Sequence, residues 1–387
     1  MLKFIRFFGG CMMAMLFAFS CSGPGNKTDI SEPIHFFVGS SDGKLEHSIF
    51  LCSLDPLSDE FVVLDSFAGA KSPSYLALST GKEMVYTIND ETADPASGHM
   101  SVSSFRMDPE DYSLSFLNSQ SSEGAGPCHI SCSNDEDHIF VANYSSGHCA
   151  AFPLAEDGSI AKASSVVIGT GSGPVESRQK GPHAHMVMPD PGDNFLLVPD
   201  LGTDKVGIYA FDKKSGRLTP NPDQAFLKLD PGSGPRHLVF HPGGEIVYVV
   251  NELSSTVTAC SYDGEKGKLT ILQTVSTVSD SHKGAKYPAA VRVHPEGSFL
   301  YASTRGEHSK ITAFRIEEDG RIYRIQEEEV THWPREFNLH PSGEFMLVAG
   351  ERSGIIELYR IDGESGRFKK AETELVLPSP ACIVYLN

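Results

Sequence analysis

Several common signatures are scarce in this chain of 387 residues. It has one tryptophan, and after the N-terminal segment no stretch carries the apolar stripe of an amphipathic helix. Gly and Pro are plentiful instead, at 36 and 24 residues, and they separate many short β-branched and aromatic runs. This pattern predicts an all-β protein.

Positive charge is also in short supply. The chain has 32 Lys and Arg residues against 50 Asp and Glu residues, which gives a formal net charge of −18. An acidic chain repels the phosphates of nucleic acids and the surfaces of anionic membranes, so we expect neither as a partner. An anionic ligand would need local basic residues to overcome this field, which makes any arginine at a pocket informative.

Closely paired cysteines are lacking too. A zinc site needs ligands clustered at tight spacing, and no CxxC pair or similar cluster occurs. We therefore expect no metal and no cofactor. The cysteines beyond Cys21 are interpreted as buried free thiols, and they are Cys52, Cys128, Cys132, Cys149, Cys260 and Cys382.

The first twenty residues form a separate object. Lys3 and Arg6 precede an almost wholly apolar run at 11–19, which is typical of a secretory signal peptide and too short for a transmembrane helix. A small residue before Cys21 suggests lipoprotein cleavage at that cysteine. We expect an exported, periplasmic lipoprotein that touches the membrane only through its lipid anchor, with a signal peptide at 1–20 and a flexible linker at 21–32.

A repeat runs through the rest of the chain. An apolar strand follows a proline, a turn such as HPGG or HPEG comes next, and a second apolar strand such as EIVYVVN follows. Two further strands complete a four-stranded antiparallel unit, and such units bury their faces by stacking radially. The prolines recur 46 to 55 residues apart, at Pro73, Pro127, Pro182, Pro235, Pro288, Pro334 and Pro380.

The last unit is incomplete at the C-terminus. Pro380 opens PACIVYLN, with no second strand after it, whereas IHFFVGSSDG at 34–43 matches the missing strand and its loop. We therefore predict that residues 33–387 form a seven-bladed β-propeller, closed by pairing of the N- and C-terminal strands in one blade. Two packed β-sandwiches are the alternative, but they do not explain one period with split halves at the termini.

Chemistry-bearing side chains recur at two places in these units. Equivalent positions of a propeller lie on one face, so we expect these side chains to converge on one mouth of the central channel. Those at the start of the inner strand are His129, His183, His185, Arg236, His237 and Arg335. Those after the second strand are Asn89, Asn143, Asp200, Asn251, Glu252, Arg305 and Glu351.

Several linked motifs carry a family resemblance. GSGPVESRQKGPHAH at 171–185, then VPDLGTD, GPRHLVFHP with YVVNEL, and VRVHPEGSFLYAS with TRG occur in order. Together they resemble the bacterial lactonase family, which contains cycloisomerase-type 6-phosphogluconolactonases and fungal carboxy-muconate lactonising enzymes. The chain departs from the family pattern where Glu, Asn and Asn-Gln are usual, at Ala290, Thr304 and Gly350–Glu351 respectively.

The resemblance implies a lactone-handling pocket. Lactone hydrolysis is acyl transfer to water, and it needs a base together with donors for the oxyanion. The family's key residues fall on His183 or His185 and on Glu252 as catalytic groups, with Glu252 or one histidine as the base. Substrate binding falls on Arg178, Arg236, His237 and Arg305, because guanidinium groups suit an oxyanion, a phosphate or a carboxylate.

The family-implied substrate is 6-phosphogluconolactone. Phosphorylated intermediates are cytoplasmic, however, so an exported enzyme would suit an unphosphorylated lactone. A non-catalytic periplasmic propeller that binds a ligand or a protein is the competing hypothesis. A ring-closing cycloisomerase that runs the same acid–base chemistry in reverse is a third.

Overall fold

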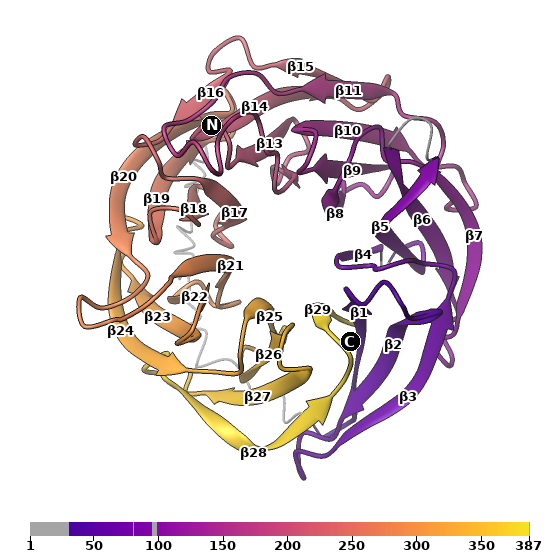
Figure 1. Ribbon diagram of the computed structural model, residues 1–387, viewed down its shortest axis with the longest axis vertical. Helices are drawn as coiled ribbons and strands as arrows, with labels where there is room; N and C mark the ends of the chain where they lie inside the picture. Colours follow the sequence, from indigo (N-terminus) through magenta and orange to yellow (C-terminus); the bar gives the residue numbers. More distant parts are fainter. Residues whose placement is uncertain (1–30, 80, 95–98, 387) are drawn as a thin grey trace, which may run out of the picture. The chain divides into compact units, whose positions relative to one another are not determined.

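The computed structural model describes residues 31–79, 81–94 and 99–386. Ser31–Asn387 form one compact unit, in which seven antiparallel sheets surround a central opening (Figure 1). The predicted all-β, seven-bladed propeller is thereby confirmed. The expected signal peptide and Cys21 lie outside the described residues.

One sheet joins the two ends of the propeller. Its strand order is β29-β1-β2-β3, and β29 lies beside β1 in Figure 1. Phe36 pairs with Tyr385 and Gly39 pairs with Cys382, so the C-terminal strand is the inner strand of the blade that the N-terminal strand continues. The bounds are Ile34–Ser40 for β1, His47–Leu54 for β2, Phe61–Ala68 for β3 and Pro380–Tyr385 for β29.

The other six blades follow in chain order, each starting at the channel. The next two comprise β4 Leu76–Ser79, β5 Met84–Asp94, β6 His99–Met107 and β7 Leu114–Ser121, then β8 Pro127–Cys132, β9 His138–Asn143, β10 His148–Pro153 and β11 Ser165–Ile168. The fourth comprises β12 Met188–Pro189, β13 Phe195–Asp200, β14 Lys205–Asp212, β15 Arg217–Pro220 and β16 Phe226–Lys228. The last three comprise β17 Pro235–Phe240, β18 Ile246–Asn251, β19 Thr256–Asp263 and β20 Lys268–Ser276, then β21 Tyr287–Val293, β22 Phe299–Arg305, β23 Lys310–Ile316 and β24 Ile322–Glu329, then β25 Pro334–Leu339, β26 Phe345–Gly350, β27 Ile355–Ile361 and β28 Phe368–Val376.

The blade that follows Pro182 is irregular. Its inner strand β12 has two residues, and upstream of it Ala184 makes a single bridge to Asp200. The main-chain N–H of His183 donates to the Asp200 carboxylate at 2.7 Å rather than to a strand. The sequence predicts a full inner strand here, but a side chain has replaced part of the ladder, and the segment that carries His183 and His185 keeps only a few main-chain hydrogen bonds to the second strand, such as that from His185 N–H to the Pro199 carbonyl at 2.9 Å.

Apolar faces hold neighbouring blades together. One buried cluster joins Leu197 and Val206 of one blade to Leu238 and Val249 of the next, and similar clusters lie between other blades. Burying a side chain of this size stabilises the fold by about 1.5–3 kcal/mol. Hydrogen bonds fix the rotation of the blades, because tyrosines of second strands donate to glycine carbonyls of the following blade, as Tyr248 does to Gly320 at 3.0 Å.

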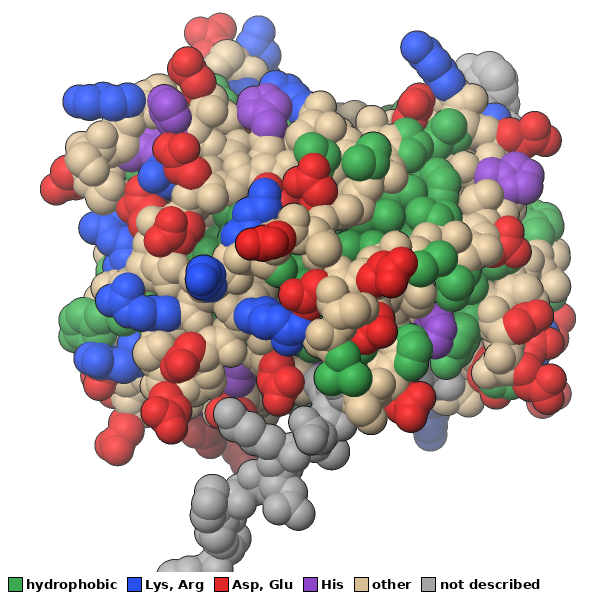
Figure 2. All heavy atoms as spheres, turned by 90° about the horizontal axis from the view of Figure 1, so that it is seen from below, with side chains coloured by type: hydrophobic (Ala, Val, Ile, Leu, Met, Phe, Trp, Pro, Cys, Tyr) green, Lys and Arg blue, Asp and Glu red, His purple; other side chains and the backbone are tan. Residues whose placement is uncertain are grey.

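The exterior carries charges of both signs as well as exposed hydrophobic side chains (Figure 2). Figure 2 shows acidic side chains interspersed with basic ones across one side of the propeller. The six cysteines of the described region are free, as predicted, and four of them are buried, whereas Cys128 and Cys132 are only half-buried. Among the described residues no group of His, Cys, Asp and Glu could hold a metal ion, and no helix is long and apolar enough to cross a membrane.

Candidate active site

A cavity of about 290 Å³ opens at one mouth of the channel. Of the predicted site residues, His185, Glu252, Arg178 and Arg305 line it. His183, Arg236 and His237 do not line it, but they contact residues of its wall. The full lining is Ser74, Asp90, Gly126, Pro127, Cys128, Tyr144, Ser145, Arg178, His185, Glu252, Arg305 and Arg335.

Bulges in the inner strands aim side chains at this mouth. In β8, β17 and β25 the register shifts immediately after the proline, so one residue has no partner on the second strand. The extra residues are Cys128, Arg236 and Arg335. A β-bulge redirects a side chain relative to a regular ladder, which explains how a proline-led strand presents a cation or a thiol at the channel end.

Glu252 is the centre of an ionic cluster. It follows β18 and is 4% exposed. Its Oε1 lies 2.7 Å from Arg178 Nη2, and its Oε2 lies 2.6 Å from Arg305 Nη2 and 3.2 Å from Arg236 Nε. The Arg236 contact is ionic rather than an aligned hydrogen bond, because that N–H has no acceptor in line with it. One carboxylate thus holds three guanidinium groups.

The charges of this cluster outweigh its burial. Burial alone would raise the pKa of Glu252, but Arg305, Arg236 and Arg178 lower it to about 2. Burial and the charge of Arg305 lower the pKa of Arg236, and Glu252 opposes that shift. Because a guanidinium group is extremely basic, Arg236 stays protonated at neutral pH. The cluster therefore carries a net positive charge.

The two histidines of the HAH segment face different surroundings. His183 stacks on Tyr144 with ring centroids 4.5 Å apart, and its Nδ1 lies 2.8 Å from the Tyr144 carbonyl oxygen. His185 is 7% exposed, and its Nδ1 lies 3.7 Å from Cys128 Sγ. Burial, together with the charges of Arg236 and Arg335, lowers the pKa of His185 well below its usual value. His185 is thus a neutral group at the cavity wall.

His237 belongs to a row of rings beneath the cavity. Its Nε2 lies 3.1 Å from Arg236 Nη1. The same Arg236 nitrogen donates a hydrogen bond to the Ala289 carbonyl oxygen at 2.7 Å. The His237 ring lies 5.4 Å from His185 and 5.6 Å from His129. Burial and Arg236 hold the pKa of His237 well below its usual range. His237 therefore supports Arg236 from below rather than meeting a ligand in the cavity.

Asp90 and Arg335 complete the cavity on its other side. Asp90 lies in β5, directly after Asn89, just as Glu252 directly follows Asn251 of β18. That repeated position is the signal that identifies Asp90, although the sequence patterns singled out only Asn89. Arg335 Nε lies 3.7 Å from Glu351 Oε1, a loose contact that leaves most of its donors available.

Further along the channel lies a second buried ion pair. Arg292 Nη2 lies 2.5 Å from Glu336 Oε1, and the same nitrogen lies 3.5 Å from the Tyr75 hydroxyl. Burial raises the pKa of Glu336, and the charges of Arg292 and Arg236 only partly offset it. Neither member of the pair lines the cavity that holds Glu252.

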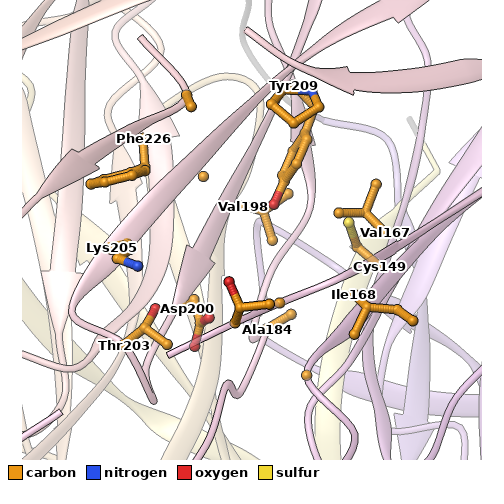
Figure 3. A pocket seen from close by; sticks show the side chains of 16 residues that line it. Cys149, Val167, Ile168, Ala184, Val198, Asp200, Thr203, Lys205, Tyr209 and Phe226 are labelled. Atoms are coloured by element: carbon orange, nitrogen blue, oxygen red, sulfur yellow. The ribbon is translucent and has the colours of Figure 1, made fainter. Parts of the chain in front are cut away.

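A separate cavity of about 230 Å³ lies between two blades, behind the HAH segment. Figure 3 shows aliphatic side chains from β11 and β13 on one wall and Lys205 near Phe226 on the other. The Lys205 ammonium lies 4.7 Å from the centroid of the Phe226 ring. This cavity contains none of the seven predicted site residues, so we assign the chemistry to the channel mouth.

The run Gly39–Gly43 has the GxSxG spacing of a nucleophile elbow. Such an elbow requires a turn from a strand into a helix. Here the run connects β1 to its antiparallel neighbour β2, and Ser41 donates to the Glu351 carboxylate at 2.9 Å. Its geometry is that of a hairpin rather than of a catalytic serine.

Comparisons with known proteins agree with this architecture. A family model described as lactonase, 7-bladed beta-propeller, matches residues 35–385. A 6-phosphogluconolactonase of Bacillus subtilis is 33% identical over 318 residues, covering 82% of this chain and 88% of the relative. A 6-phosphogluconolactonase of Formosa agariphila is 30% identical over 346 residues, 88% of this chain and 96% of the relative. The solved structure of a periplasmic gluconolactonase of Pseudomonas aeruginosa aligns with a TM-score of 0.85 at 28% identity, covering 92% of this chain and 99% of that one.

Proposed function

The chain belongs to the seven-bladed β-propeller lactonase family, and on that premise we propose that it hydrolyses 6-phosphogluconolactone to 6-phosphogluconate. Membership makes it a lactone hydrolase, as the sequence motifs predict. One observation carries the choice of an anionic substrate, namely the gathering of Arg178, Arg305 and Arg335 around one cavity, with Arg236 behind Glu252 of its wall.

The charge balance supports an anion in this cavity. Three arginines line it against two carboxylates, those of Glu252 and Asp90. Planar guanidinium groups bind phosphate and carboxylate through paired hydrogen bonds. A cationic cavity in a chain of net charge −18 is a local reversal of the global field. Such a reversal favours a ligand that carries negative charge.

The ionic cluster also fits the transition state of lactone hydrolysis. Attack of water on the lactone carbonyl places negative charge on the carbonyl oxygen, and preorganised donors lower the energy of that oxyanion. Glu252 holds Arg305, which lines the cavity, in a fixed position before substrate arrives, so little reorganisation is needed. The donors are buried, which strengthens their effect.

A second candidate substrate is unphosphorylated gluconolactone. The solved relative from Pseudomonas aeruginosa is a periplasmic gluconolactonase, and the leader expected at 1–20 would export this chain to the same compartment. Without a phosphate, the lactone would use the arginines for its oxyanion and for the carboxylate product only.

The experiment is a direct assay of both lactones with the purified protein, corrected for spontaneous hydrolysis. We expect acceleration of 6-phosphogluconolactone hydrolysis and a loss of about 100-fold in kcat/KM on substitution Arg305→Ala, which removes an oxyanion donor that lines the cavity. A wild-type rate equal to spontaneous hydrolysis for both lactones would leave a non-catalytic binding propeller. Faster turnover of gluconolactone would favour the second candidate.

We also propose that the mature protein is a periplasmic lipoprotein anchored through Cys21. The apolar leader and its position before Cys21 support this location. Fractionation of cells that express the wild type and Cys21→Ala tests it. The wild type should sediment with membranes and the variant should not, and recovery of both in the same fraction would contradict the anchor.

A further inference from the structure

We propose that Asp90 is the base that activates water in this cavity, and that Glu252 is a positioning residue for the arginines. This inference rests on the proposed lactone hydrolysis and deepens it. Asp90 lines the cavity from β5 and is exposed to solvent through it. Within the described part of the chain, no side-chain hydrogen bond or ion pair holds its carboxylate. The main-chain N–H of Asp90 donates to the Lys71 carbonyl oxygen at 3.1 Å.

Glu252 is badly placed for a base. Both of its oxygens already contact guanidinium groups, Oε1 that of Arg178 and Oε2 those of Arg305 and Arg236, so the carboxylate is engaged by three cations before water arrives. Transfer of a proton to Glu252 would also remove the charge that holds Arg178, Arg236 and Arg305 together. With a pKa of about 2, the carboxylate is in addition a very weak base.

The histidines are also engaged or weakly basic. His183 is stacked on Tyr144 and its Nδ1 faces the Tyr144 carbonyl. His237 lies beneath the cavity with its Nε2 against Arg236. His185 reaches the wall, but burial and nearby arginines disfavour the imidazolium that general-base catalysis would create.

Asp90 combines an open carboxylate with a favourable shift. Partial burial raises the pKa of Asp90 and the charge of Arg335 opposes that shift, so the carboxylate is a stronger base than that of an ordinary aspartate. Cys128 is close enough for the Asp90 charge to affect the pKa of its thiol. The remaining titratable groups of the cavity wall are Tyr144, Arg178, His185, Glu252, Arg305 and Arg335.

The proposed step balances as follows. Water oxygen forms a bond to the lactone carbonyl carbon while Asp90 accepts one water proton, and the carbonyl π electrons move onto the oxyanion facing the arginines. Collapse of the tetrahedral intermediate breaks the bond between the carbonyl carbon and the ring oxygen. Asp90 returns its proton to that leaving oxygen, which gives the open-chain hydroxy acid and restores the free carboxylate.

The test is the pH dependence of kcat/KM in the wild type, Asp90→Asn, Asp90→Glu and Glu252→Gln. We expect wild-type activity to fall on its acid side as Asp90 is protonated. Asp90→Asn should lose about 100-fold or more in kcat together with that acid limb, because general-base catalysis typically contributes 10²–10⁴-fold. Asp90→Glu should keep the limb at a shifted pH. Glu307→Gln removes an exposed carboxylate after β22, outside the cavity, and is the matched control.

The outcomes separate this inference from the proposed function. Glu252→Gln should reduce activity but keep the acid limb, as expected for a positioning residue. An active wild type with an unchanged acid limb in Asp90→Asn overturns the assignment of Asp90 and leaves the lactonase standing. Loss of the limb in Glu252→Gln rather than in Asp90→Asn makes Glu252 the base. A wild type that hydrolyses neither lactone overturns both proposals.

Discussion

Two glutamates are buried in the same channel, and their pKa values are shifted in opposite directions. The pKa of Glu252 is lowered to about 2 under three arginines, whereas that of Glu336 is raised although Arg292 lies 2.5 Å away. Both are nearly inaccessible to solvent, at 4% and 1% exposed. Burial alone therefore does not decide the charge state of a carboxylate in this channel.

The difference teaches that the number of cations in direct contact with the carboxylate decides its charge state. Among the described residues, Glu336 contacts one cation, Arg292, and the more distant Arg236 and Arg335 do not make up the remaining loss of hydration, whereas three guanidinium groups in contact with Glu252 outweigh its burial. The excess of positive charge around Glu252 also leaves the cavity cationic, so the cluster that stabilises this carboxylate also favours an anionic ligand. The Arg292–Glu336 pair has one charge of each sign and leaves no such excess.

The largest expected effect is that of Glu252→Gln. The isosteric amide leaves the buried guanidinium groups of Arg236 and Arg305, and the one-third exposed group of Arg178, without their counter-charge, and breaking a buried ionic cluster costs about 3–5 kcal/mol. The midpoint of denaturant unfolding at pH 7 measures the loss. A variant as stable as the wild type would show that the arginines find other partners, and the comparison between the two glutamates would lose its basis.

A smaller effect should appear in the pH dependence of stability. The pKa of Glu252 falls from 4.5 to about 2 on folding, so its contribution, roughly 3 kcal/mol, is present above pH 4.5 and is lost as the pH falls towards 2. The stability gap between the wild type and Glu252→Gln should therefore narrow on acidification. Thermal unfolding from pH 7 to pH 3 tests this.

Glu336 should behave in the opposite sense and more weakly. Its raised pKa means that the folded state binds a proton more readily, so the wild type loses stability as the pH rises above 4.5. Glu336→Gln should cost about 1 kcal/mol at pH 4 and less at pH 7. If the stability difference between the wild type and Glu336→Gln widened as the pH rises, as is expected for Glu252→Gln, it would contradict the raised pKa of Glu336.

The smallest effect is expected from Tyr144→Phe. The Tyr144 hydroxyl lies 3.3 Å from Arg178 Nη2, which is a long hydrogen bond. The Arg178 side chain is one-third exposed, more than the other two arginines of the cluster. Loss of that hydrogen bond should cost about 0.5 kcal/mol and raise KM by about twofold, because the stack on His183 remains. An effect on kcat larger than that of Arg178→Ala would indicate that the tyrosine meets the substrate itself.

The propeller could be predicted from the sequence because its signal is repeated. Pro127, Pro235, Pro334 and Pro380 are the first residues of inner strands, as their spacing indicates. The Pro182 unit departed from the pattern because its main-chain hydrogen bonds go partly to the Asp200 side chain. A pattern of apolar residues does not report which carboxylate will replace a ladder bond.

The candidate site could be predicted only where a charged residue or a histidine occupies a rim position of the repeat. Glu252, Arg305 and His185 stand at rim positions and line the cavity. Arg236 and His237 are neighbours at the start of β17 and lie next to the cavity without lining it, and sequence periodicity does not predict which rim residues reach the lining. Asp90 was missed because its surroundings come from three distant segments, and only folding brings Cys128 and Arg335 near it.

The pairing of β1 with β29 has a consequence in kinetic terms. Phe37 and Val384 are partners in a single ladder although nearly the whole described chain separates them. Contacts between such distant residues form slowly, since the intervening chain must be ordered first. Ring closure is thus expected to be the late event of folding, and the seam the first place where the closed ring opens. The lifetime of the site, which needs all its blades in place, is then set by a strand pair that contributes no residue to the cavity.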